Sequence, residues 1–164
     1  MAGYKVISSD NHVIEPAELW TSRAESKFKD RVPHVKRLED GDWWFCDGYR
    51  FVGTADGTQA GLRFEDPSKL QPTRTVEEVR PGGYIPEEHV KDMDEDGVYG
   101  SIVFPTIGLS LFSTVNSQLL TELFRIYNGW LAEFCKPFPD RLKGIAMLNV
   151  DDVPEGVKEL ERCA

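Results

Sequence analysis

Short apolar runs alternate along this chain with longer stretches of helical period. Each run is rich in β-branched or apolar residues and is bounded by glycine, proline or polar residues, which is typical of strands. The strands predicted in this way cover residues 4–9, 100–104 and 142–148. Over about 113–136, apolar residues recur with the helical period and form one wide face. Pro86 and Pro154 each suit the first turn of a further helix.

A second pattern interrupts this alternation. Two aromatic runs, 42–46 and 49–53, flank Asp47-Gly48, the pair favoured in a type I′ hairpin because both turn positions need a positive φ. Residues 21–40 are charged and are expected to be irregular, and 54–82 form a long excursion rich in Gly, Pro, Thr and Asp. The hairpin arm and loop insertion therefore cover about 40–82.

Without this arm, the predicted order is strand, helix, strand, helix, strand, helix. Such alternation predicts an α/β fold with parallel strands joined by right-handed helical crossovers. Three parallel strands make a poor complete sheet, since parallel sheets need cover on both faces. We expect one domain over 1–164 that is incomplete, because the predicted last helix reaches the end of the chain.

Composition narrows the class of partner. The 164 residues carry 19 Lys+Arg against 28 Asp+Glu, a formal net charge of −9, which argues against nucleic acid or an anionic membrane as a partner. Cys46, Cys135 and Cys163 are odd in number and form no CxxC pair, which fits a reducing compartment. No run approaches the ~20 apolar residues of a membrane span, and no signal peptide is visible. A cytoplasmic location is expected.

The candidate chemistry lies at the end of the first strand. Because side chains alternate along a strand, Ser8, Asp10 and His12 would point to one side. A carboxylate and an imidazole on one face suit a divalent cation such as Zn²⁺ or Mn²⁺. A lone Asp-x-His also arises by chance, and Asp is an ordinary turn residue after a strand. Glu15 is a further ligand, a supporting acceptor or, the interpretation favoured here, a helix-start carboxylate.

Other chemistry-bearing residues favour structural interpretations. His34 falls in the charged excursion and is expected to be solvated, and His89 is expected to lie on the surface of a helix beside two glutamates. Cys135 is interpreted as a packed small hydrophobe. Gly82-Gly83 precedes a helix but lacks the full glycine pattern of a phosphate loop.

The aromatic hairpin leaves two alternatives open. Trp43, Trp44 and Phe45 could line a substrate mouth, whereas adjacent aromatics on both faces of a hairpin more often pack on the body or on a partner subunit.

Taken together, several segments resemble one family. The opening Val-Ile-Ser-Ser-Asp-Asn-His-Val-Ile-Glu-Pro-Ala-Glu-Leu-Trp (6–20) resembles the start of the amidohydrolase-related metal-dependent hydrolases. This branch of the amidohydrolase superfamily includes the aminocarboxymuconate-semialdehyde and resorcylate decarboxylases. Further segments that fit the family pattern, in the right order, are 89–98, 103–106, 127–131 and 141–146.

The resemblance implies a distorted (β/α)₈ TIM barrel with one catalytic divalent metal at its C-terminal face. In this branch the first strand supplies an acidic-x-His ligand pair, and Asp10 and His12 occupy those two positions. Zinc is the metal expected, with manganese or iron as alternatives, because an oxygen and nitrogen donor set admits all three. A histidine near the middle strands and an aspartate on the last strand complete the family's site, and the aspartate or the metal handles the proton or hydroxide.

This chain departs from the family in length. TIM barrels need about 250 residues, and the sequence covers about the first three βα units. The later histidine and the proton-transfer aspartate have no counterpart here, since neither His34 nor His89 ends a predicted strand. Three explanations remain: a fragment, which we favour, a split enzyme completed by another chain, or a remnant that no longer catalyses.

Two functions are therefore expected. The first is the N-terminal part of a metal-dependent hydrolase of C–N or ester bonds, or of a carboxy-lyase, acting on a small carboxylated or carbonyl substrate and not active as this chain alone. The second is a non-catalytic, subunit-like protein that associates through its unfinished barrel edge. In either case we expect a homo-oligomer or a completing chain, because open strand edges and apolar helix faces drive association.

Overall fold

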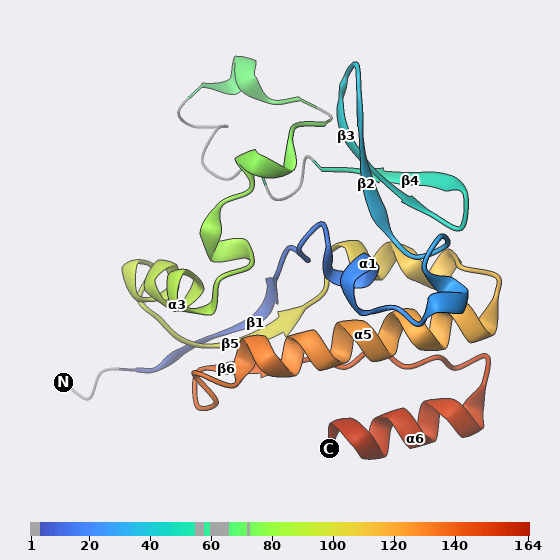
Figure 1. Ribbon diagram of the computed structural model, residues 1–164. Coiled ribbons are helices and arrows are strands. Elements are labelled where there is room, and N and C mark those ends of the chain that lie inside the picture. The colour runs from blue at the N-terminus through green and yellow to red at the C-terminus, as the bar shows by residue number, and fades with distance from the viewer. Residues whose placement is uncertain (1–3, 55–57, 60–65, 72) are drawn as a thin grey trace.

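The computed structural model describes residues 4–54, 58–59, 66–71 and 73–164 (Figure 1). Within this part of the chain two sheets are present. The parallel sheet has the strand order β1-β5-β6, and the antiparallel sheet has the order β2-β3-β4. Their bounds are β1 Val6–His12, β5 Val98–Phe104, β6 Leu142–Gly144, β2 His34–Leu38, β3 Gly41–Cys46 and β4 Tyr49–Gly53.

Local signals explain where the longer helices begin and end. The helices are α1 Leu19–Arg23, α3 Pro86–Glu95, α4 Ile107–Ser110, α5 Ser117–Cys135 and α6 Val153–Cys163. Pro86 occupies the first turn of α3, and Gly97 follows its end with a φ of 70°, a conformation that glycine adopts without strain. The Asn116 side chain accepts from the Leu119 backbone N–H at 2.8 Å and so starts α5.

The core joins α5 to both sheets. Helix α5 runs beside the parallel sheet and α6 lies next to it (Figure 1). The α5 face that the sequence predicts to be apolar is buried, with Leu123 fully inaccessible. Trp20 donates its indole N–H to the Leu123 carbonyl oxygen at 3.1 Å, and its ring meets Trp44 of β3 edge-to-face with 5.7 Å between centroids. Burial of these aromatic rings therefore anchors the antiparallel sheet on the body of the protein.

The hairpin turn lies at Asp47-Gly48. These residues have φ values of 51° and 83°, the positive values that a type I′ turn needs, and β3 and β4 pair antiparallel around them. The prediction of an irregular 21–40 is wrong for part of that segment, because β2 pairs with β3 along its full length. A charged strand is suited to a sheet edge, where the side chains remain solvated, and its alternation in the sequence is correspondingly weak.

The third parallel strand is shorter than the predicted 142–148. It ends at Gly144, and further along the chain the Asn128 side chain of α5 hydrogen-bonds both backbone groups of Met147. The Met147 N–H donates to Asn128 Oδ1 at 2.8 Å, and Asn128 Nδ2 donates to the Met147 carbonyl at 2.9 Å. A buried amide thus satisfies backbone groups that would otherwise need a neighbouring strand. The first strand, in contrast, extends beyond the predicted 4–9 and includes Asp10 and His12.

The Candidate Metal Centre

Asp10 and His12 lie together at the carboxyl end of β1. Asp10 Oδ1 is 3.3 Å from His12 Nε2, and the two side chains are 76% and 41% exposed. They line an open groove of about 1000 Å³ together with Ser8, Asn11 and His89. The carboxylate and the imidazole that the sequence places on one face are therefore adjacent and accessible.

The His12 ring is held in one orientation by the end of β5. Its Nδ1 lies 2.7 Å from the Pro105 carbonyl oxygen, with the Thr106 hydroxyl 3.3 Å away. A carbonyl only accepts hydrogen bonds, so Nδ1 carries the proton and donates it, and Nε2 of the neutral ring carries the lone pair. Metal-binding histidines are commonly fixed in this way, with the second ring nitrogen donating to a carbonyl.

This donor pair fits one divalent ion. With Nε2 unprotonated, its lone pair and the Asp10 carboxylate face each other at 3.3 Å, an arrangement that needs a positive charge between them, from a proton or a metal ion. Two ligand atoms each about 2.1 Å from a common ion lie roughly 3.0–3.4 Å apart in octahedral or tetrahedral geometry. Among the described residues, no group of three or more His, Cys, Asp or Glu side chains is arranged around a common point.

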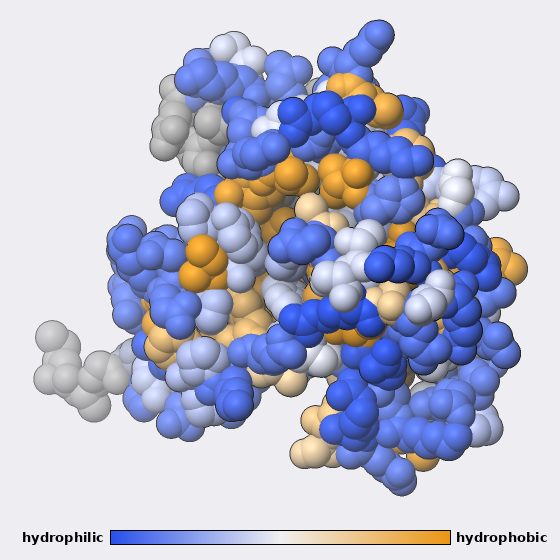
Figure 2. Space-filling view, in the orientation of Figure 1, coloured by the Kyte–Doolittle hydropathy of each residue, from blue (hydrophilic) through white to orange (hydrophobic). Residues whose placement is uncertain are grey.

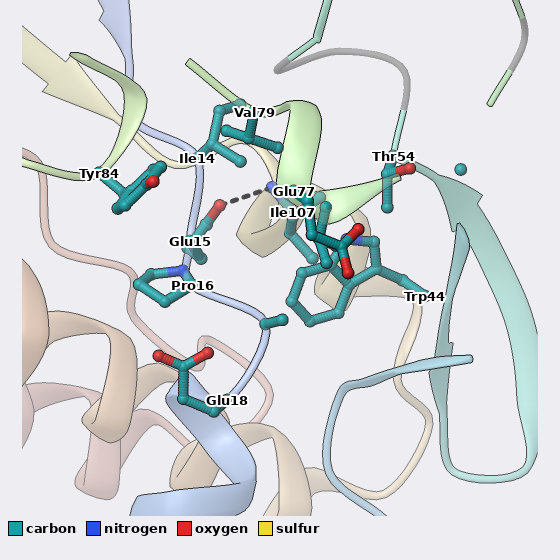
Figure 3. A pocket seen from close by; sticks show the side chains of 13 residues that line it. Ile14, Glu15, Pro16, Glu18, Trp44, Thr54, Glu77, Val79, Tyr84 and Ile107 are labelled. Atoms are coloured by element: carbon teal, nitrogen blue, oxygen red, sulfur yellow. Dashed lines mark hydrogen bonds between the residues drawn. The ribbon is translucent and has the colours of Figure 1, made fainter. Parts of the chain in front are cut away.

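Glu15 lines a different cavity, an apolar pocket of about 280 Å³ between the β1–α1 connection and β3, shown in Figure 3. Its carboxylate is only 1% exposed and accepts from the backbone N–H groups of Ile107 at 3.0 Å and Gly108 at 2.9 Å. Burial raises the pKa of Glu15, and these backbone donations oppose part of that rise. Glu15 is thus a helix-start carboxylate, but for α4, about ninety residues away.

Figure 2 shows a largely hydrophilic face on which apolar side chains gather toward the centre, below the antiparallel sheet and its neighbouring loop. The apolar side chains that line the pocket include Ile14, Val76 and Val79, with Trp44 on one side. Of the two alternatives for the hairpin aromatics, packing on the body applies to Trp44, which is buried against Trp20.

His89 does not lie on the surface, and that prediction is wrong. The residue is on α3 and only 6% exposed. Its Nδ1 lies 2.7 Å from the Gly82 carbonyl, and its Nε2 lies 3.1 Å from Nδ2 of Asn11. The sequence shows His89 beside two glutamates on a helix, and only the tertiary fold turns it inward against Phe134, with 5.5 Å between ring centroids.

The prediction that His34 is solvated also needs correction. His34 is half-buried at the start of β2, where its ring stacks on Phe45 with 6.1 Å between centroids. Its Nδ1 is bonded to the Val32 carbonyl at 2.9 Å. Cys135 is half-buried, and burial raises the pKa of its thiol, as suits a packed cysteine.

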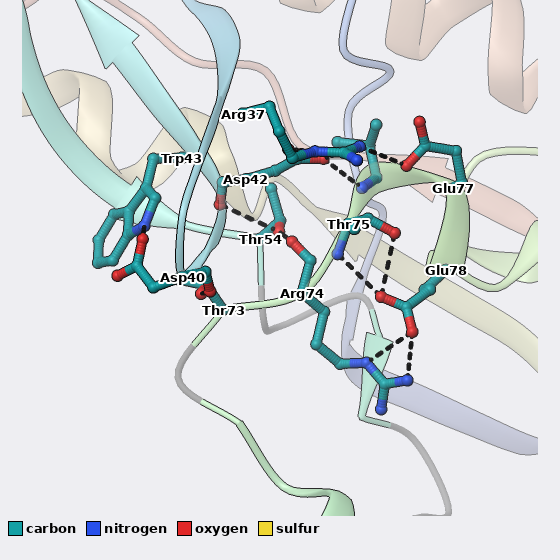
Figure 4. Close-up of polar contacts among 11 residues, drawn as sticks. Arg37, Asp40, Asp42, Trp43, Thr54, Thr73, Arg74, Thr75, Glu77 and Glu78 are labelled. Carbon is teal, nitrogen blue, oxygen red and sulfur yellow. Dashed lines mark hydrogen bonds and ion pairs between the residues drawn. The ribbon is translucent and has the colours of Figure 1, made fainter.

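A polar network attaches the antiparallel sheet to the segment that follows it (Figure 4). Asp42 is buried, pairs with the Arg37 guanidinium and accepts from the Val76 N–H at 2.8 Å. Burial alone would raise the pKa of Asp42, but these two partners more than offset it and hold the pKa below its usual range. Glu77 extends the network, with a 2.8 Å ion pair to Arg37.

The fold matches that of solved amidohydrolases and decarboxylases. No family model and no curated protein matches the sequence. An amidohydrolase (map2389c) from Mycobacterium avium subsp. paratuberculosis K-10 superposes with a TM-score of 0.75 at 21% identity, over 99% of this chain and 46% of that one. A 2,6-dihydroxybenzoate decarboxylase from Rhizobium gives 0.53 at 19% identity, over 98% and 35%.

A dihydroxybenzoic acid decarboxylase from Polaromonas sp. JS666, with bound manganese and the inhibitor 2-nitroresorcinol, gives a TM-score of 0.53 at 22% identity, over 98% and 35%. The chain thus spans less than half the length of each of these structures. The structural comparison agrees with the fold that the resemblance implies: the chain has an amidohydrolase-like fold that corresponds to part of such a TIM barrel. No helix among the described residues has the length and apolar character of a membrane span.

Proposed function

We propose that this chain supplies the first-strand part of a divalent-metal site in an amidohydrolase-type enzyme, with Asp10 and His12 as ligands. The observation that carries the proposal is the 3.3 Å separation of Asp10 Oδ1 and His12 Nε2, combined with the 2.7 Å hydrogen bond that His12 Nδ1–H donates to the Pro105 carbonyl oxygen. Zn²⁺ suits this oxygen and nitrogen pair, and so do Mn²⁺ and Fe²⁺.

The proposed reaction is hydrolysis, or non-oxidative decarboxylation, of a small carboxylated or carbonyl compound. A divalent ion bound at the pair would polarise the substrate's carboxylate or carbonyl oxygen. The chain's own residues orient the ligands: the Pro105 carbonyl fixes the His12 tautomer, and the side chains of Asp10 and His12, 76% and 41% exposed, line an open groove. Manganese in the Polaromonas decarboxylase structure supports a divalent ion.

The remaining ligands and the proton-transfer aspartate are proposed to come from outside the 164 residues, on a further segment or on a second chain. The share of the solved structures that this chain spans, 46% of the amidohydrolase and 35% of the decarboxylases, supports this division. Glu15 is not proposed as a ligand, because both of its oxygens already accept from backbone N–H groups in a separate pocket.

The test is metal content per chain by plasma mass spectrometry, with dissociation constants for Zn²⁺ and Mn²⁺ from calorimetry. Asp10→Ala and His12→Ala are each expected to lose bound metal, whereas His34→Ala, which removes a histidine on the antiparallel sheet, is the matched control and should bind as wild type does. Metal bound equally by wild type and both ligand variants would refute the assignment.

A second candidate function is a subunit-like protein that associates with another chain. The observation that favours it is a row of exposed apolar side chains on α6, Val153, Val157 and Leu160, spaced so as to share one helix face. The strand β1 is also an edge strand among the described residues, with Val6 and Ile7 more than half exposed. Either a second copy or a chain that completes the barrel would cover them.

Sedimentation velocity tests this candidate. Wild type is expected to self-associate, or to bind a separately expressed completing segment, and the double variant Val157→Lys, Leu160→Lys should weaken that association. Lys158→Gln, on the same helix but in a 158–155 ion pair, is the control. A monodisperse monomer for wild type, with no binding of a completing segment, would contradict this second function.

A further inference from the structure

The pairing of β1 with β5 does not by itself fix the position of Asp10. Ser8 pairs with Ser101 and Asn11 pairs with Val103, so three steps along β1 match two steps along β5. The extra residue makes a bulge, and bulges interrupt the ladder and re-aim the side chains near them. Asp10 lies within this register shift and therefore needs another means of support.

That support is a chain of side-chain hydrogen bonds through Asn11 and His89. The His12 backbone N–H donates to Asn11 Oδ1 at 2.9 Å, which orients the Asn11 amide and turns its Nδ2 toward His89 Nε2, 3.1 Å away. On its other side the His89 ring reaches the Gly82 carbonyl at 2.7 Å.

The partners define the protonation of His89. The Gly82 carbonyl can only accept, so His89 Nδ1 carries a proton, and the Asn11 amide nitrogen can only donate, so His89 Nε2 accepts. His89 is therefore the neutral Nδ1–H tautomer. Each polar atom from the Gly82 carbonyl to the His12 N–H then acts either as a donor or as an acceptor in its hydrogen bond. Both ring nitrogens are used, which leaves none to coordinate a metal.

This chain of hydrogen bonds from Gly82 through His89 and Asn11 to His12, called the relay below, is held in place by buried packing and by a backbone contact. The His89 ring is buried edge-on against Phe134 of α5, with an interplanar angle of 85°. The turn that holds the Gly82 carbonyl also binds the chain just after β1, because the Ile14 N–H donates to the Gly83 carbonyl at 2.7 Å. Two contacts thus attach the segment 82–83 to the chain on either side of His12.

We propose that His89 and Asn11 are positioning residues that hold the bulged end of β1 so that Asp10 and His12 present their ligand atoms to one metal ion. This inference rests on the proposed function. It assigns no contact with the metal or the substrate to either residue, since both act through the backbone of His12. Supporting partners of this kind typically change metal affinity by about 10–100-fold when they are removed.

The experiment compares two variants that break the relay with one that only loosens packing. His89→Phe keeps an aromatic ring against Phe134 and loses both hydrogen bonds, and Asn11→Ala removes the link in the middle. Met93→Ala is the matched control, because Met93 is buried on α3 and no relay bond involves it. Dissociation constants for Zn²⁺ and Mn²⁺ are measured for all, together with amide exchange at His12 and the ring ¹⁵N shifts of His89 in metal-free protein.

The dissociation constant is expected to be 10–100-fold larger in His89→Phe and Asn11→Ala and unchanged in Met93→Ala. The His12 amide should exchange faster in the two relay variants only. The ¹⁵N shifts should show Nδ1 protonated and Nε2 unprotonated in wild type. Metal binding by wild type with unchanged affinity in both relay variants would overturn this inference and leave the proposed function standing. No metal binding by wild type would overturn the proposed function, and this inference with it.

Discussion

Replacing Glu15 with alanine removes the acceptor for two backbone groups at once. The Glu15 carboxylate receives the Ile107 and Gly108 N–H groups at 3.0 and 2.9 Å where the chain leaves β5 and enters α4. The carboxylate, Ile107 and Gly108 are all buried, so water does not readily replace the lost oxygen atoms. Two of the free N–H groups at a helix start would then lack a partner.

The cost follows from these two groups. A buried donor left without a partner lowers the free energy of unfolding by about 1–3 kcal/mol. Removing a carboxylate whose burial is unfavourable offsets part of this decrease. We therefore expect Glu15→Ala to lower the free energy of unfolding by about 2–5 kcal/mol at pH 7. For a domain of this size such a loss lowers Tm by roughly 5–15 °C.

Urea unfolding followed by tryptophan fluorescence measures this cost. The midpoint should fall without a change in the slope of free energy against urea. Glu18→Ala is the control, because Glu18 is an exposed glutamate three residues further along the chain, and surface changes of this kind stay within about 0.5 kcal/mol. If Glu15→Ala were as stable as Glu18→Ala, the argument that Glu15 completes the start of α4 would be refuted.

The pH dependence provides an independent check. Burial raises the pKa of Glu15 above its ordinary 4.5, so the native protein holds this proton more tightly than the unfolded chain. Between the two pKa values the contribution of Glu15 to the free energy of unfolding falls as pH rises. Glu15→Gln has no such titration, and wild type should therefore lose stability relative to Glu15→Gln as pH rises from 4 to 7. A difference that is constant over this range would contradict the raised pKa.

Three further predictions concern the core, a thiol and an ion pair. Leu123→Ala should cost about 2–5 kcal/mol in urea unfolding, since Leu123 is fully buried, and a loss under 1 kcal/mol would argue against the α5 packing. Burial raises the pKa of Cys46 to about 11, so at pH 8 a thiol reagent should label exposed Cys163 quickly and Cys46 only as the protein unfolds. The Arg74 guanidinium and the 75–78 turn lower the pKa of Glu78 to about 2, so Arg74→Ala should bring that pKa toward 4.5 in an NMR titration. An unchanged Glu78 titration would rule out this pairing.

The elements that could be predicted from the sequence are those set by local chemistry. Asp47-Gly48 needs only its own backbone preferences to form a turn, and Pro86 and Gly97 mark the limits of α3 in the same way. The end of β6 is different, because it depends on Asn128, an amide nineteen residues earlier in the chain that bonds both backbone groups of Met147. An asparagine within an apolar helical pattern gives no sign of the segment that it will bind.

In the candidate site, too, some features follow from local sequence and others depend on residues far away in the chain. The alternation of side chains predicts that Asp10 and His12 share a face, and the 3.3 Å between Asp10 Oδ1 and His12 Nε2 agrees with it. The bulge in β1 nevertheless makes simple alternation an incomplete reason. The His12 ring is oriented by the Pro105 carbonyl, ninety-three residues away. In the proposed site its backbone is oriented through His89, which helical position alone would place at the surface. Candidate residue types can therefore be proposed from the sequence, whereas the protonation and rigidity that the proposed metal site requires arise only when three distant segments meet.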